Sequence, residues 1–172
     1  VGFPLSSIEH SGVADALELF AAGGLAAPEF RRFITEELPD WRARIDATVW
    51  QRVEAAGNLD DRTVRQRRGR LAAFAAEAAN ALRDLDGWVT PTVAITPPRL
   101  SEITTLDRYR SANLLALRNT AIANFLGLCA ITLPVGRDDA GLPVGLQVLH
   151  AAGGDEELLA IAARIERDLA AR

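Results

Sequence analysis

The segment from residue 127 to 149, GLCAITLPVGRDDAGLPVGLQVL, restricts the fold of this chain more than any other stretch. Two short apolar runs surround the polar sequence RDDA, and a glycine or proline stands wherever the chain has to change direction. Glycine adopts the backbone conformations of tight turns, and proline interrupts the hydrogen-bond ladder of a strand. The segment therefore predicts a hairpin with buried strands at 129–135 and 144–150, and its two aspartates are interpreted as turn residues rather than acid-base catalysts.

The first half of the chain, residues 1–85, is predicted to be mainly helical. Its apolar residues recur at helical spacing, and glycine or proline ends each helical pattern. The longest helix is expected within residues 59–87, where Leu71, Phe74, Ala78, Leu82 and Leu85 form one buried stripe. A shorter continuous helix is expected from Asp40 to Gly57.

The second half, residues 86–172, predicts a strand, a helix at 106–126, the hairpin and a last helix that starts near Asp155. Together the two halves predict one domain, residues 1–172, of the α/β class, with helices packed on a small mixed β-sheet. Such short apolar strands are typical of a larger sheet that is covered on both faces.

Composition excludes several classes of function. A net charge of −4 over 172 residues predicts no attraction to nucleic acid or to anionic membranes. There is no uncharged apolar run of about 18 residues, the length that a membrane span needs. The single cysteine excludes an internal disulfide and favours a reducing, cytoplasmic location. The chain contains no lysine, which excludes Schiff bases and lysine general bases supplied by these residues.

Two groups of polar residues interrupt apolar surfaces and are candidates for a binding site. Asn113, Thr120 and Asn124 are seven and four residues apart, so they share one face of the predicted helix. Such a stripe either ties down a neighbouring loop or faces a ligand cavity. Thr90 and Thr92 flank a proline at the end of a predicted strand, where pocket residues of open α/β sheets are common, although β-propensity alone also explains them.

Cysteine and histidine offer little chemistry in this sequence. Cys129 begins an apolar strand and is interpreted as a small buried hydrophobe. A thiol enzyme based on Cys129 would need a nearby base, and neither His10 nor His150 has a spacing that implies one. The sequence has only two histidines and one cysteine, and they are not clustered, so it predicts no metal site.

Four segments, taken together, resemble the C-terminal region of amidase signature enzymes in their order and spacing. They are DGWVTPT at 86–92, RNTAIANFLGLCAITLPVG at 118–136, GLPVGLQVL at 141–149 and DEELLAIAARIE at 155–166. The resemblance implies the C-terminal part of an α/β/α sandwich and a hydrolase of carboxamide C–N bonds that needs no cofactor. It also implies a triad of Ser, cis-Ser and Lys, whose members belong to the N-terminal and central parts of the family's fold.

The same resemblance implies a set of substrate-binding positions and no catalytic residue. The positions that match the family's substrate pocket are Thr90, Thr92, Asn119, Thr120 and Asn124. Many members have proline where Cys129 stands, and this departure leaves the substrate open.

Two main hypotheses about function follow. In the first, the chain is the C-terminal portion of an amidase-like hydrolase, inactive alone, which meets a small amide substrate only together with an N-terminal part. In the second, it is a non-catalytic assembly or binding module derived from the amidase fold. In either case an incomplete sheet is expected to favour self-association or a homo-oligomer.

Overall fold

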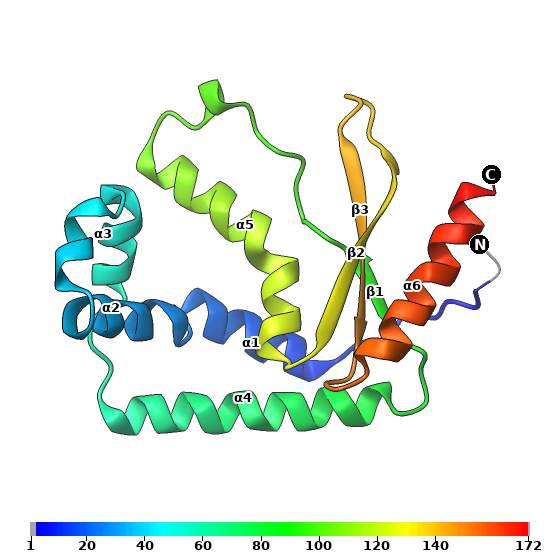
Figure 1. Cartoon of the computed structure of the whole chain (residues 1–172), viewed down its shortest axis with the longest axis horizontal. Helices are drawn as coiled ribbons and strands as arrows, with labels where there is room; N and C mark the ends of the chain where they lie inside the picture. Colours follow the sequence, from blue (N-terminus) through cyan, green and yellow to red (C-terminus); the bar gives the residue numbers. More distant parts are fainter. Residues whose placement is uncertain (1–2, 172) are drawn as a thin grey trace.

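The computed structural model describes residues 3–171, which fold into helices around one small sheet (Figure 1). The elements, in chain order, are α1 (Ser11–Ala21), α2 (Ala26–Glu36), the 3-10 helix η1 (Pro39–Arg44), α3 (Ala47–Ala55), α4 (Asp61–Leu82), β1 (Trp88–Pro91), the 3-10 helix η2 (Leu100–Glu102), α5 (Leu106–Phe125), β2 (Cys129–Arg137), β3 (Pro143–His150) and α6 (Asp155–Ala170). None of these helices is both long and apolar enough to span a membrane.

The predicted hairpin is present, as β2 and β3. Its register runs from Cys129 opposite His150 to Arg137 opposite Pro143, with an irregularity between Pro134 and Gly136. Asp138 closes the turn because its carboxylate accepts hydrogen bonds from the amides of residues 140 and 142. The turn interpretation of this aspartate is therefore confirmed.

The α/β class is confirmed, but the described strands pair antiparallel throughout rather than in a mixed sheet. The strand order is β1-β3-β2. Both β1 and β2 are antiparallel to β3, so they run in the same direction, and α5 connects them. Because β3 lies between them, this strand-helix-strand crossover produces no parallel pair.

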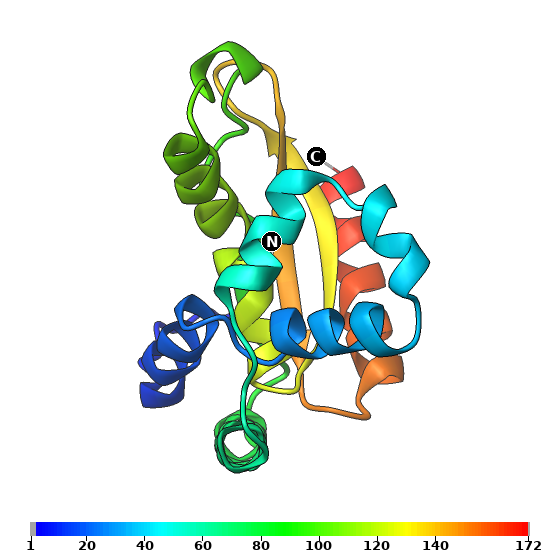
Figure 2. The same cartoon turned by 90° about the vertical axis from the view of Figure 1, so that its left-hand side faces the viewer.

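The sheet lies between two helical layers. Helix α6 covers one face, and α1, α4 and α5 lie on the other side, as Figure 2 shows from the edge. Strand side chains alternate between the faces. Val148 accordingly belongs to the cluster under α6, whereas Leu149 belongs to the cluster on the opposite side.

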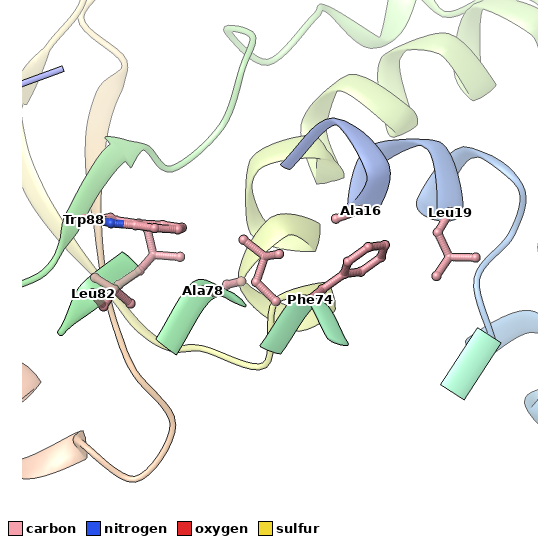
Figure 3. Close-up of a cluster of buried hydrophobic side chains, with 9 residues drawn as sticks. Ala16, Leu19, Phe74, Ala78, Leu82 and Trp88 are labelled. Carbon is pink, nitrogen blue, oxygen red and sulfur yellow. The ribbon is translucent and has the colours of Figure 1, made fainter. Parts of the chain in front are cut away.

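The stripe predicted on the longest helix forms the larger core. Phe74, Ala78 and Leu82 of α4 are buried, and they pack with α1 and with Trp88 of β1 (Figure 3). Leu71 and Leu85 extend this stripe as partly buried side chains. The 3.6-residue period of the sequence thus identified the packed face correctly.

The helix expected from Asp40 to Gly57 is broken in the structure, and that prediction was wrong at its centre. Residues 39–44 form η1, and α3 starts afresh after Asp46. The Asp46 carboxylate accepts hydrogen bonds from the amides of Thr48 at 2.8 Å and Val49 at 3.3 Å, which is an N-cap. Because the Asp46 side chain binds the backbone amides at the start of α3, it favours a new helix start over a helix that runs through from η1. This local hydrogen bonding outweighs the apolar period.

Candidate substrate-binding site

A polar row crosses the sheet on the face that is opposite α6. The register places Thr90 of β1, Gln147 of β3 and Thr132 of β2 side by side. Residues in one row of a sheet point to the same face. The Gln147 side chain is 3% exposed, and its Nε2 donates to Thr90 Oγ1 at 3.3 Å.

Thr92 extends this row into a patch. It lies just beyond β1, where its amide donates to the carbonyl of Gly145 at 2.9 Å. Its Oγ1 donates to Thr132 Oγ1 at 3.2 Å. We call the side chains of Thr90, Thr92, Thr132 and Gln147 the polar patch.

Helix α5 is fastened to the sheet beside the polar patch. Asn119 is 8% exposed, and its Nδ2 donates to the carbonyl of Pro91 at 2.8 Å. In return, Gln147 Nε2 donates to the backbone carbonyl of Asn119 at 3.3 Å. A buried amide without partners is costly, so these bonds fix the position of α5 over the sheet.

Gly145 makes the close contact between strands possible. A Cβ atom at this position would lie 2.6 Å from Thr92 Oγ1 and 2.9 Å from Thr132 Cγ2. Both distances are far shorter than van der Waals contact. The glycine that was interpreted from the sequence as turn punctuation therefore also admits the two threonine side chains.

The structure brings together three of the five predicted site residues: Thr90, Thr92 and Asn119 all take part in or adjoin the polar patch. Thr120 instead donates to the carbonyl of Leu117 within its own helix at 3.1 Å. Asn124 is exposed on the last turn of α5.

Sequence reasoning missed Thr132 and Gln147. The signal for Gln147 was present, because it is an isolated polar residue in the apolar strand VGLQVLH. Its partners could not be found by spacing, since Thr90 is 57 residues away. For Thr132 the sequence held no such signal, because a threonine within a strand is explained by β-propensity alone.

A hollow of about 250 Å³ lies next to this site, between α5 and the connection that leads from β1 to α5. Asn113, from the predicted polar stripe, lines it together with Ala112 and Ala116 of the same helix. The stripe is therefore divided: Asn113 lines the hollow, Thr120 is half-buried, and Asn124 is exposed.

The thiol of Cys129 does not have the surroundings of a nucleophile. Its Sγ donates to the carbonyls of His150 at 3.4 Å and Ala151 at 3.2 Å. Burial, with the nearby negative charge of Asp155, raises the pKa of the Cys129 thiol. His150 lies directly opposite in the register, a neighbour that the spacing did not suggest, but the thiol contacts its backbone carbonyl. A thiol held protonated in this way is a poor nucleophile.

Two solved structures share this fold. The 6-aminohexanoate cyclic dimer hydrolase, solved in complex with its substrate, superposes with a TM-score of 0.74 over 98% of this chain and 38% of its own, at 23% identity. A crystal structure described as an amidase superposes with a TM-score of 0.72 over 92% of this chain and 36% of its own, at 24% identity. The fold is therefore that of amidases.

Sequence comparison identifies the family. The family model described as Amidase matches residues 17–159. The 2-amino-5-chloromuconic acid deaminase of Comamonas testosteroni is 39% identical over 166 residues, which cover 96% of this chain and 35% of that protein. The chain belongs to the amidase family, as the four sequence segments predicted, and it spans about a third of the length of this relative.

Proposed function

We propose that this chain is the C-terminal portion of an amidase-like hydrolase of carboxamide C–N bonds, and that the polar patch forms part of its substrate-binding wall. The observation that carries the proposal is the row of Thr90, Gln147 and Thr132 beside Asn119, on a chain of the amidase family. Hydroxyl and amide groups both donate and accept hydrogen bonds, as a carboxamide requires of its partners.

In this proposal the reacting groups come from outside the chain. The family resemblance implies a lysine base acting through a bridging serine, and the sequence contains no lysine. The residues of the polar patch would therefore orient a small amide substrate. In this proposal the nucleophile, the base and the oxyanion donors belong to an N-terminal part. Hydrolysis by these residues alone is not expected.

A chimera tests this division of labour. The 166-residue region of the Comamonas testosteroni deaminase that aligns with this chain is replaced by the chain itself. Ammonia release is then measured with 2-amino-5-chloromuconate and with simple carboxamides. We expect no release above background from the 172-residue chain and catalytic release from the chimera.

A matched pair of substitutions in the chimera locates the binding role. Thr132→Val removes a hydroxyl from the polar patch, and Thr104→Val removes one from an exposed position outside it. We expect only Thr132→Val to raise KM, by about threefold to tenfold, the loss of one neutral hydrogen bond. Hydrolysis by the chain alone, or equal effects of both substitutions, would contradict the proposal. A folded but inactive chimera would favour the non-catalytic binding module.

A further inference from the structure

The side-chain amide of Gln147 is held in one orientation at the centre of the polar patch. Its Nε2 donates to the backbone carbonyl of Asn119 at 3.3 Å and to Thr90 Oγ1 at 3.3 Å. A backbone carbonyl can only accept hydrogen bonds, so the atom of Gln147 that faces Asn119 has to be the amide nitrogen. The two bonds use both hydrogens of Nε2, and they fix which end of the amide faces α5 and β1.

The other end of the amide, Gln147 Oε1, keeps its capacity to accept hydrogen bonds. Within the described residues no hydrogen bond to Oε1 forms, yet Oε1 is not one of the buried polar atoms that lack a partner. The oxygen is therefore accessible, although the residue as a whole is only 3% exposed. A nearly buried side chain thus presents one uncharged acceptor atom at the surface of the polar patch.

An acceptor that cannot turn away selects for a donor. Rotation of the Gln147 amide by half a turn would place its oxygen against the carbonyl oxygen of Asn119, and two acceptors cannot bond to each other. The hydroxyls of Thr92 and Thr132 are already engaged with one another, at 3.2 Å. A bound molecule with an N–H group satisfies Oε1, whereas an oxygen or a methyl group at that place leaves Oε1 without a partner, which is costly away from water.

We propose that Gln147 Oε1 accepts a hydrogen bond from the N–H group of a carboxamide substrate. The inference rests on the proposed function and deepens it, because it narrows the substrate class to primary and secondary amides, which have at least one N–H. Esters and fully substituted amides have no such donor, so Gln147 is a specificity-determining residue that acts against them. Because the Gln147 side chain is uncharged, this selection requires no ionised substrate.

Binding to the 172-residue chain tests this contact without hydrolysis. N-methylbutanamide and methyl butanoate differ only by an N–H in place of an oxygen, and N,N-dimethylbutanamide keeps the amide carbonyl but has no N–H. Each compound is titrated, and the NMR resonance of the Gln147 Cδ carbon, which is bonded to Oε1, is followed. We expect only N-methylbutanamide to move this resonance. Its Kd should be about threefold to tenfold lower than those of the other two compounds, the value of one neutral hydrogen bond.

A matched pair of substitutions makes the test specific to this side chain. Gln147→Leu removes the acceptor and keeps a side chain of similar size, while Gln66→Leu makes the same change at an exposed position of α4. We expect Gln147→Leu to abolish the preference for N-methylbutanamide over methyl butanoate, and Gln66→Leu to preserve it. In the chimera, Gln147→Leu should lower kcat/KM for the amide up to about tenfold more than for the ester, whereas a purely structural role would lower both alike. If Gln147→Leu does not fold, the three compounds on the parent chain decide alone.

The proposal is overturned if the three compounds bind alike or not at all, if the Gln147 Cδ resonance responds equally to all of them, or if Gln147→Leu leaves the preference for the amide intact. None of these results bears on whether the chimera hydrolyses amides. Conversely, a folded chimera without hydrolysis, together with selective binding of N-methylbutanamide to the parent chain, would contradict the proposed hydrolase function and still support Gln147 as an acceptor for N–H groups.

Discussion

At the scale of single residues, the polar patch depends on the absence of one side chain. Gly145 allows Thr92 and Thr132 to approach its backbone, and these threonines are joined by a hydrogen bond. The χ1 angle of threonine is restricted. Thr92 or Thr132 could therefore move away from a new methyl group only by breaking the hydrogen bond between them. The close packing is therefore specific to glycine at this position.

We expect Gly145→Ala to lower the free energy of unfolding by about 1–3 kcal/mol, the usual cost of overpacking. Gly69→Ala is the matched control, because Gly69 lies within α4 and an added Cβ there would meet nothing within 4 Å. That control should stabilise the chain by about 0.5–1 kcal/mol, since alanine favours a helix. Urea unfolding of both variants checks the prediction, and effects of the same sign would refute it.

At the scale of elements, the segment from η1 to α3 shows how a cap divides a helical pattern. The helical unit around it has its own small core of Ile34, Trp50 and Val53, separate from the two clusters that flank the sheet. Trp41, which lies at the start of the expected continuous helix, belongs to η1 and is 54% exposed. The apolar period indicated helical structure correctly, but it could not locate the interruption.

We expect Asp46→Ala to destabilise this unit by about 1 kcal/mol through loss of the N-cap of α3. Asp40→Ala, which removes an exposed aspartate from the first turn of η1, is the control and should have a smaller effect. Chemical denaturation followed by the fluorescence of the three tryptophans, of which Trp50 lies in the core of this unit, checks the prediction. Equal losses for the two variants would mean that the cap has no special role.

At the scale of the whole molecule, α5 exposes apolar side chains beside its packed face. Leu114, Leu115 and Leu117 are 47%, 40% and 42% exposed. A helix that is apolar on several sides is typical of the interior of a larger assembly. Strands β1 and β2 are also the two edges of the described sheet. We propose that the isolated chain associates with itself through these surfaces.

Sedimentation velocity over a range of concentrations tests the association. We expect the chain to sediment faster as concentration rises, and the double variant Leu114→Gln with Leu117→Gln to shift toward the monomer, because burial of these leucines would drive contact. Leu100→Gln, at an 88% exposed position on η2, is the control and should change little. A parent chain that stays monomeric at high concentration would contradict the proposal.

Local features of the fold were predictable because their causes lie within a few residues of one another. Turn glycines and prolines located the hairpin, whose strands span 129–137 and 143–150 against the expected 129–135 and 144–150. The periodic stripe on α4 and the start of α6 at Asp155 were found for the same reason. The four segments that resemble amidases were likewise sufficient to identify the family.

The sequence by itself determined the α/β class, the hairpin, the packed face of α4 and the family membership, since each depends on short-range pattern or on motif order. Only the tertiary structure decided that β3 lies between β1 and β2, and that Gln147 therefore stands between Thr90 and Thr132. The physical reason is distance along the chain: strand register between residues 57 apart is set by how α4, α5 and α6 pack on the sheet, and no local spacing records it.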